Sequence, residues 1–517
     1  MSTRLVTRPL VLLFLCFAVP LEAQDASKIL DQYVKASGGA HALAKIQTLT
    51  LEGTVAAQNG GKPGAYTFAV KMPNRYYSEL VIGDQTLIEA FNGKSAWHQN
   101  AGAEISTLVG PEGVQLEAAA RYYNSHLLNP KKNKLVITYV GTAPVRGKDA
   151  SQLQISTPSG VQWQVFFDVQ SHLIVKESAQ VGGVNQEILY DGYRAENGVQ
   201  LPHKIELHRG AEIYSIAVTR AAVNEPVGER VFDFPRKSQV QLPDLKALFR
   251  QIDANQQALD KIKENYAGNK VEEETEYEGN GKPKKPQVRE STFFYLDGTE
   301  VSTLVKIDGQ PLSAEAQKKE TARVLKQIDE LQKNASKKES PDEKSKQARK
   351  EDEEEDVSID AFLRACQFVN PRRERFRGQD VLVFDFEPNP EFKAHTLVEK
   401  VIQKLGGVIW IDEKALDVVR LDAFFVNNVK FAGGLLADLQ KGTRVVLEQT
   451  FVNNEVWLPT YEEVHLDVRV LLLKGIKVDG TTRYSDYKKF SVETLSAIGK
   501  PKAAADPAAA NSPEKPQ

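Results

Sequence analysis

The sequence predicts an α+β protein that contains two tandem copies of one antiparallel plan. Three observations lead to this prediction. Short motifs recur in the same order in the two halves of the 517-residue chain, which is the mark of an internal repeat. Each half opens with apolar residues at helical spacing. Each then continues with strand-like runs separated by turn residues such as Asn-Gly and Asp-Gly, as in antiparallel sheets.

The repeat rests on motifs that are individually weak, because turn residues and apolar strands are common. Their shared order indicates two copies of one supersecondary plan. The paired motifs are Val145-Arg-Gly-Lys-Asp149 with Phe376-Arg-Gly-Gln-Asp380, Trp163-Gln-Val-Phe-Phe-Asp168 with Val408-Ile-Trp-Ile-Asp412, and Asn197-Gly-Val-Gln-Leu-Pro202 with Asn454-Glu-Val-Trp-Leu-Pro459.

Composition and charge restrict the class of protein. The chain is 41% hydrophobic and 26% charged, which is ordinary for a soluble globular protein of two or three domains. The formal net charge is −3, so no basic excess supports a nucleic-acid partner.

The first element in chain order, residues 1–23, is predicted to be a secretory signal peptide. Arg4 and Arg8 precede an apolar stretch over residues 10–19, and Ala23 is the small residue expected before a cleavage site. The apolar stretch is too short to span a bilayer comfortably, and nothing later reaches that length. The mature chain is therefore expected to contain no transmembrane segment.

The first copy is predicted over residues 24–236. It opens with a helix that ends at Gly38-Gly39. Strands follow from about Leu49, and a helical insertion over residues 114–128 ends at Asn129-Pro130. The apolar stripe of the opening helix consists of Ile29, Leu30, Tyr33 and Val34.

The second copy is predicted over residues 242–499. A short amphipathic helix over residues 359–368 takes the place of the earlier insertion and also ends in Asn-Pro, at Asn370-Pro371. It contains Cys366, the only cysteine left after removal of the signal, so we expect a buried thiol and no internal disulfide. The longer opening helix has apolar residues at Leu245, Leu248, Phe249, Ile252, Leu259, Ile262 and Tyr266.

A charged insert over residues 313–356 interrupts the second copy. Ser313 is a suitable N-cap, so the insert is expected to begin as a helix. It then becomes rich in Lys and Glu and ends in an acidic run at residues 351–356. A solvated helix that fades into disorder is the preferred interpretation over a docking segment. The Ala- and Pro-rich tail at residues 500–517 is also expected to be disordered.

One predicted strand, residues 464–472, has a distinctly apolar face. Each residue of this face contributes about 1.5–3 kcal/mol when buried, so the face needs a substantial apolar partner. The pattern predicts a curved antiparallel sheet wrapped over apolar material, part of which the helices of the same copy supply. The residues of the face are Val464, Leu466, Val468, Val470 and Leu472.

No catalytic constellation stands out in the sequence. The His and Cys residues show no metal-binding spacing, and neither a P-loop nor a Gly-x-Ser-x-Gly elbow is present. Asp168 and Asp412 lie in predicted hairpin turns, where aspartate commonly binds its own turn backbone. The sequence therefore predicts a protein that is not an enzyme and uses no cofactor.

The export signal, opening helix and antiparallel meander resemble the LolA/LolB family of periplasmic lipoprotein carriers. The motifs that carry the resemblance are Phe91-Asn-Gly-Lys-Ser-Ala-Trp97, Gly407-Val-Ile-Trp-Ile-Asp412 and Val456-Trp-Leu-Pro459. The resemblance implies two tandem half-open β-barrels, each lidded by helices, with acyl chains held on the concave face. The chain departs from the family in having two copies and a charged insert.

The resemblance also implies a function: an exported carrier or chaperone in outer-membrane biogenesis, periplasmic or associated with the outer membrane. Its partner would be a lipid or an acylated lipoprotein. The alternative is a non-catalytic envelope module that binds another protein, as in stress sensing. The residues expected to line the lipid cavity, for which core packing is the alternative role, are Phe68, Val70, Trp97, Phe166, Phe384, Trp410, Phe424, Trp457, Leu466, Val468 and Val470.

Overall fold

The structure is a computed structural model that describes residues 21–60, 62–235, 243–278, 282–338, 359–431, 437–469 and 476–489. The chain divides into two compact units, Met1–Pro235 and Arg236–Gln517. The predicted tail, the acidic run of the insert and most of the predicted signal peptide lie outside the described residues.

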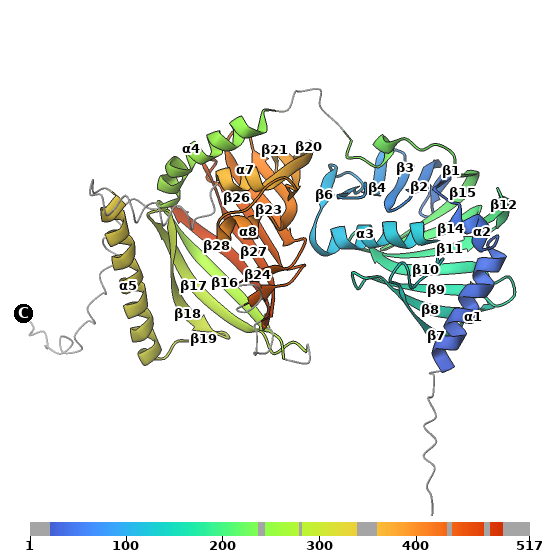
Figure 1. Cartoon of the computed structure of the whole chain (residues 1–517), viewed down its shortest axis with the longest axis horizontal. Coiled ribbons are helices and arrows are strands. Elements are labelled where there is room, and N and C mark those ends of the chain that lie inside the picture. Colours follow the sequence, from blue (N-terminus) through green and yellow to red (C-terminus); the bar gives the residue numbers. More distant parts are fainter. Residues whose placement is uncertain are drawn as a thin grey trace, which may run out of the picture. The chain divides into compact units, whose positions relative to one another are not determined.

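The first unit is an antiparallel sheet accompanied by helices α1 (Leu21–Ala36), α2 (Ala40–Ala44) and α3 (Gly110–Ser125). The order across the sheet is β6-β5-β4-β3-β2-β1-β15-β14-β11-β10-β9-β8-β7, and β12 and β13 form a separate hairpin (Figure 1). The strands are β1 (Thr48–Ala57), β2 (Gly64–Lys71), β3 (Arg75–Ile82), β4 (Gln85–Phe91), β5 (Ala96–Gln99), β6 (Ser106–Leu108), β7 (Val136–Val145), β8 (Lys148–Ser156), β9 (Gln162–Asp168), β10 (Ile174–Val181), β11 (Val184–Asp191), β12 (Arg194–Glu196), β13 (Val199–Leu201), β14 (Lys204–Arg209) and β15 (Glu212–Val223).

The sheet of the first unit curls around α3. This helix contacts β2 to β6 and also β10, although β1, β15, β14 and β11 separate β2 from β10 in the sheet (Figure 1). On the inner face, Glu89 of β4 accepts hydrogen bonds from Gln186 of β11 at 2.8 Å and from Arg209 of β14 at 3.2 Å. Such contacts between distant strands require the two halves of the sheet to face each other.

Two apolar clusters cover this inner face. One joins α1 and α3 to the β8–β10 half of the sheet through residues such as Leu30, Leu116 and Trp163. The other joins the α2 region to β13–β15 through residues such as Leu43 and Leu207. The predicted helix–sheet layering is therefore present in this unit, and the helices lie on the concave side.

The link between α1 and α2 holds the end of α1 against β13. The carbonyl oxygen of Ser37 accepts a hydrogen bond from Gln200 N at 3.1 Å. Gly38 has a φ of +120°, and a Cβ at this residue would lie only 2.1 Å from the carbonyl oxygen of Gly198. Because glycine alone allows this close approach, the helix predicted to end at Gly38-Gly39 does end here.

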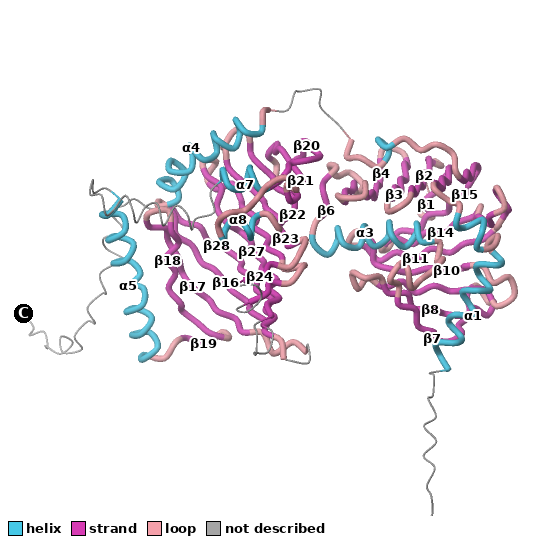
Figure 2. The backbone as a smooth tube through the Cα atoms, viewed as in Figure 1, coloured by secondary structure: helices cyan, strands magenta, loops and turns pink. Residues whose placement is uncertain are grey.

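The second unit is a second antiparallel sheet with helices α4 (Leu245–Lys263), α5 (Ala314–Lys338), α7 (Ile359–Ala365) and α8 (Leu397–Ile402) (Figure 2). The order across it is β19-β18-β17-β16-β28-β27-β26-β23-β22-β21-β20, and β25 pairs with β24 and β27. The strands are β16 (Tyr266–Glu276), β17 (Gln287–Leu296), β18 (Thr299–Ile307), β19 (Gln310–Pro311), β20 (Cys366–Phe376), β21 (Gln379–Pro388), β22 (Leu405–Asp412), β23 (Asp417–Phe425), β24 (Val429–Phe431), β25 (Ala437–Leu439), β26 (Arg444–Val452), β27 (Val456–Arg469) and β28 (Ile476–Lys489).

The two sheets share one strand order. Strands β16–β19 correspond to β1–β4, β20–β23 correspond to β7–β10, and β26–β28 correspond to β11, β14 and β15. With these matches, the second sheet repeats the strand order of the first, lacks counterparts of β5 and β6 among the described strands, and adds β24 and β25. The chain is therefore an α+β protein in which one antiparallel topology occurs twice.

The motifs that predicted the repeat occupy equivalent turns. Arg146 and Gly147, between β7 and β8, have φ values of 49° and 78°. Arg377 and Gly378, between β20 and β21, have φ values of 49° and 82°. Two successive residues with positive φ are typical of the tight type I′ hairpin turn, which explains why the Arg-Gly pair recurs.

The two aspartates in predicted turns act as expected. Oδ1 of Asp168 accepts hydrogen bonds from the backbone N–H groups two and three residues later, and Oδ1 of Asp412 does the same. Both side chains are buried, so the backbone bonds satisfy carboxylates that water does not reach freely. The prediction of a turn-forming role is confirmed at both positions.

Two predictions at the boundaries of helices in the second unit were wrong. Tyr266 begins β16 instead of continuing α4, because its backbone pairs with β28 and its buried ring packs against the core. Cys366 begins β20 directly after α7, and Asn370-Pro371 lies at a bulge inside β20 instead of ending a helix. Cys366 is nevertheless buried, and burial raises the pKa of its thiol to about 12.

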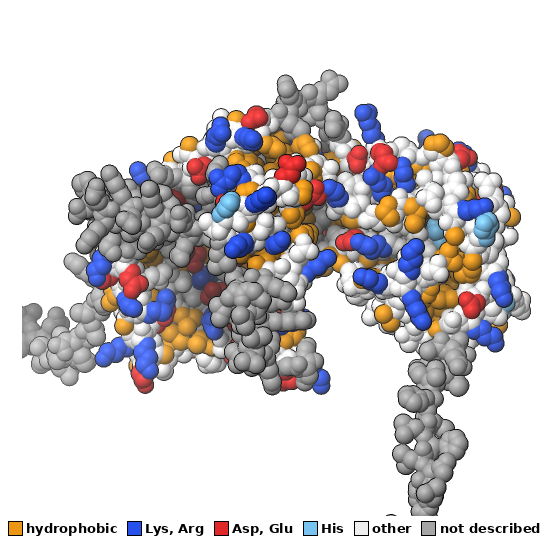
Figure 3. Space-filling model, viewed as in Figure 1, with side chains coloured by type: hydrophobic (Ala, Val, Ile, Leu, Met, Phe, Trp, Pro, Cys, Tyr) orange, Lys and Arg blue, Asp and Glu red, His pale blue; other side chains and the backbone are white. Residues whose placement is uncertain are grey.

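The described part of the charged insert is a solvated helix, as predicted. Ser313 Oγ accepts a hydrogen bond from Ala316 N at 3.3 Å at the start of α5. The helix contacts β18 and buries Val324, whereas Leu325 is 53% exposed. Figure 3 shows Lys, Arg, Asp and Glu side chains interspersed over the visible described surface. No described helix has the length and apolar character needed to cross a membrane.

Replacing Gly38 by alanine is expected to destabilise the protein more than the same change at Gly39. A Cβ at Gly38 would meet a backbone oxygen at 2.1 Å, whereas at Gly39 nothing lies within 4 Å. Both residues have positive φ, and such strain alone costs about 1–3 kcal/mol, so Gly39→Ala controls for it. Urea unfolding gives both free energies, and equal losses would contradict the close packing of α1 against the Gly198 turn.

Candidate functional site

The first unit contains a cavity of about 160 Å³ between its helices and the inner face of its sheet. Residues of α1, α3, β1–β3, β10, β11 and β13–β15 contribute to the lining. Most of the lining is aliphatic or aromatic, and it includes Leu49, Phe68, Val70, Leu127, Ile188 and Leu207. The cavity lies where the two inner-face clusters meet, because it has lining residues from both.

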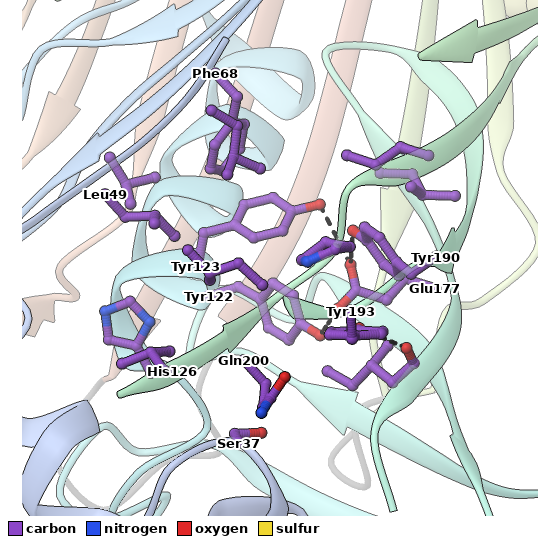
Figure 4. A pocket seen from close by; sticks show the side chains of 18 of the residues that line it. Ser37, Leu49, Phe68, Tyr122, Tyr123, His126, Glu177, Tyr190, Tyr193 and Gln200 are labelled. Atoms are coloured by element: carbon purple, nitrogen blue, oxygen red, sulfur yellow. Dashed lines mark hydrogen bonds between the residues drawn. The ribbon is translucent and has the colours of Figure 1, made fainter. Parts of the chain in front are cut away.

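A buried carboxyl group is held by tyrosine hydroxyls at this cavity. Oε1 of Glu177, on β10, accepts a hydrogen bond from Tyr122 of α3 at 2.6 Å. Oε2 accepts hydrogen bonds from Tyr190 of β11 at 2.9 Å and from Tyr123 of α3 at 3.4 Å. Figure 4 shows the side chains converging on Glu177. We call Glu177, Tyr122, Tyr123 and Tyr190 the tyrosine–glutamate cluster.

The tyrosine–glutamate cluster favours uncharged side chains. Burial raises the pKa of Glu177, and the three tyrosine donors oppose that shift without cancelling it. Burial also raises the pKa values of Tyr122, Tyr123 and Tyr190 well above that of a free phenol. A buried carboxyl with hydrogen-bond partners is tolerated where an unpaired one would be costly.

A second polar region of the cavity is formed by Ser37, His126 and Gln200 (Figure 4). Ser37 Oγ and His126 Nε2 are buried atoms without a hydrogen-bond partner among the described residues. Burial lowers the pKa of His126 from 6.5 to about 4. His126 follows α3 in a left-handed conformation with a φ of 47°, and its side chain lines the cavity.

The lining contains no fixed positive charge. Of the described residues that line the cavity, none is Lys or Arg, and the ionisable groups besides tyrosine are Glu177 and His126. No group of three or more His, Cys, Asp or Glu is placed to hold a metal ion within the described ranges. The arrangement can bind an apolar molecule and offer it a few hydrogen bonds.

The predicted cavity residues are distributed over several places. Phe68 and Val70 line the cavity of the first unit. Trp97 lies in a separate cluster, where its Nε1 donates a hydrogen bond to the carbonyl of Phe232 at 2.9 Å. Phe166 packs with another small cluster that includes Val145.

The predicted residues of the second unit are also dispersed. Phe384 packs in the helix-covered core. Trp410 Nε1 donates to Glu374 at 3.4 Å, and Trp457 Nε1 donates to Asp412 at 3.0 Å. Further along the sheet, Phe424 is 41% and Val464 40% exposed. Leu466 and Val468 are half-buried, and Val470 lies outside the described residues.

Sequence reasoning did not find the tyrosine–glutamate cluster or the Ser37–His126 region. The adjacent tyrosines at the end of the predicted helical insertion, Tyr122 and Tyr123, were the available signal. A single acidic residue in a strand usually faces solvent. In addition, the register between β9 and β10 shifts just before Glu177, so counting alternate residues along β10 does not predict which face carries its side chain. Only the curl of the sheet brings α3 to this carboxyl.

Comparisons with known proteins find matches among solved structures. No protein-family model and no curated protein matches the chain. A DUF1329 family protein from Desulfovibrio piger is similar at 11% identity and a TM-score of 0.28, over 40% of this chain and 97% of that one. A LolA superfamily protein from Nitrosomonas europaea is similar at 10% identity and a TM-score of 0.27, over 40% and 97%.

A larger part of the chain is similar to one chain in the structure of the MucA/MucB complex from Pseudomonas aeruginosa. This match has 8% identity and a TM-score of 0.17, over 90% of this chain and 99% of that one. A LolA superfamily protein is thus among the solved structures to which part of the chain is similar.

Stability as a function of pH is expected to report the buried carboxyl of Glu177. Its folded pKa lies above the ordinary 4.5, so the folded state holds the proton more tightly than the unfolded state. This contribution to stability is complete below the unfolded pKa and is lost as the pH rises through the folded pKa. The unfolding free energy of the wild type minus that of Glu177→Gln should therefore decrease with rising pH.

Urea unfolding between about pH 4 and pH 8 measures that difference, with Glu212→Gln at an exposed position as the control. Tyr122→Phe removes the hydroxyl that donates to Glu177 at 2.6 Å, and this bond favours the ionised carboxylate. The pKa of Glu177 should therefore rise further in that variant, and the decrease in stability should occur at higher pH. A difference that is independent of pH for Glu177→Gln would contradict the assigned environment.

The opposite pH dependence is expected from His126. Its folded pKa of about 4 lies below the ordinary 6.5, so the unfolded state takes up the proton first as the pH falls. Stability that is present above the unfolded pKa is therefore lost between about pH 6.5 and pH 4. Replacement by glutamine should remove this loss, whereas His41→Gln at an exposed site should not. Identical curves for the two variants would show that His126 is accessible to water.

Proposed function

We propose that the chain is an exported periplasmic carrier or chaperone for a lipid or an acylated lipoprotein, acting in outer-membrane biogenesis. In this proposal each unit is a half-open β-barrel lidded by helices, and the first unit holds apolar cargo. The observation that carries the proposal is the apolar cavity between α1, α3 and the inner face of the sheet. An apolar ligand gains binding energy there without any reactive group.

The size of the cavity limits what it holds without rearrangement. An engineered cavity of about 150 Å³ in another protein stays dry and binds benzene, so about 160 Å³ is room for a short stretch of acyl chain. Each buried methylene contributes about 0.8 kcal/mol. A longer chain requires neighbouring side chains to move, and the half-buried rings of Phe68 and Tyr123, 5.4 Å apart, border the cavity.

The first test is to identify bound lipid. Protein purified from its native host is extracted with organic solvent, and the extract is examined by mass spectrometry. We expect a stoichiometric amount of one acyl-chain class. If nothing co-purifies and the uncharged probe N-phenyl-1-naphthylamine shows no saturable fluorescence increase with the protein, the carrier proposal fails.

A substitution that fills the cavity should reduce this binding. Ile188 lines the cavity and is not fully buried, so Ile188→Phe adds volume where the structure has room. We expect probe affinity to fall about tenfold, corresponding to roughly 1.4 kcal/mol. Val136→Phe on the exposed face of β7 is the control, since Val136 is 64% exposed and outside the lining. Unchanged affinity in Ile188→Phe would place the probe elsewhere.

A further inference from the structure

Ser37 Oγ is a buried polar atom of the cavity lining. The residue is 3% exposed, lies directly after α1 and has no hydrogen-bond partner for its hydroxyl among the described residues. The phenol of Tyr33, on α1, is close enough for Ser37 to affect its pKa, but no hydrogen bond of acceptable geometry joins the two hydroxyls. A buried hydroxyl without a partner in the protein is rare, because such a group costs free energy unless it is hydrogen-bonded.

His126, at the end of α3, supplies a second buried polar atom without a hydrogen-bond partner in the described chain. Its Nε2 has no partner among the described residues, and the ring lies at the end of α3 while Ser37 lies at the end of α1. Figure 4 shows both side chains at the cavity, with Gln200 near Ser37. A ligand oxygen in this region could therefore accept a hydrogen bond from the hydroxyl of Ser37 or bind His126.

The charge of the lining restricts the ligand to neutral groups. An ionised carboxylate or phosphate would find no Lys or Arg in the described lining. A buried charge without a partner is strongly disfavoured. An uncharged hydroxyl or ester oxygen would satisfy the unpaired atoms without that penalty.

We propose that the cavity binds a chain that carries an uncharged oxygen function, an alcohol or an ester, which is hydrogen-bonded by Ser37 and His126. This inference rests on the proposed carrier function and makes it more specific. Ester-linked acyl chains and long-chain alcohols belong to the class, and ionised fatty acids do not. The aliphatic part of the ligand would occupy the region lined by Leu49, Ile188 and Leu207.

Competition for N-phenyl-1-naphthylamine tests the class of ligand. With the full chain at about pH 8, 1-octanol and methyl octanoate should displace the probe at concentrations at least tenfold lower than octanoate does. Octanoate is then fully ionised, because carboxyl pKa values lie near 4. Equal displacement by octanoate would overturn the inference and leave the carrier function standing. Absence of saturable probe binding would instead count against the carrier function itself.

Two substitutions test the polar contacts. Ser37→Ala should weaken displacement by 1-octanol about fivefold while leaving the affinity for the probe, which cannot use the hydroxyl in the same way, within twofold. Ser78→Ala is the matched control, because Ser78 also lines the cavity but its hydroxyl is not among the buried atoms without a partner in the described chain. If both variants bind 1-octanol like the wild type, Ser37 is not a ligand contact.

A gain-of-function variant guards against an uninformative loss of folding. Gln200→Lys places a positive charge beside Ser37, at a half-buried position. We expect this variant to bind octanoate at least fivefold more tightly than the wild type, with the wild-type circular dichroism spectrum. A folded variant with unchanged octanoate affinity would show that the polar group of the ligand is not held at this end of the cavity.

Discussion

The constraint on which the first unit depends is the need to cover the inner face of a strongly curled sheet. Curling brings β4 opposite β11 and lets Glu89 bind Gln186 and Arg209 across the interior. The apolar residues of that face lose contact with water only if helices of the same chain cover them. Helix α3 enters the curl and α1 lies over the β7 side, and between them they do not fill the space completely.

Several polar side chains lie at the cavity that the helices leave unfilled. Glu177 would be costly inside an apolar core, but the hydroxyls of Tyr122, Tyr123 and Tyr190 satisfy it and tie α3 to β10 and β11. Ser37 and His126 have no such partners in the described chain. The cavity therefore has one polar region whose side chains bond one another and a second, at Ser37 and His126, to which we assign the polar group of the proposed ligand.

Sequence patterns predicted turns and secondary-structure elements more reliably than they predicted which elements pack against one another. The Arg-Gly turns at Gly147 and Gly378 and the turn-forming aspartates Asp168 and Asp412 depend on local backbone geometry, which a few residues encode. The sequence pattern assigned Tyr266 to the helix instead of to β16, because the apolar stripe of a helix and the buried face of a strand both consist of apolar side chains. Whether Trp97 faces the concave or the convex side could not be read from an apolar residue alone, since both faces of this sheet carry buried clusters.

The sequence by itself determined the α+β class, the turns, the end of the first helix and the repetition of one plan, because periodicity and turn chemistry act over a few neighbouring residues. Only the tertiary structure decided where the cavity lies and which groups line it. Ser37, His126 and Glu177 are far apart in the sequence, and the curl of the sheet brings them to one cavity. That curvature arises from the sum of many strand pairings and helix contacts, which no short motif records.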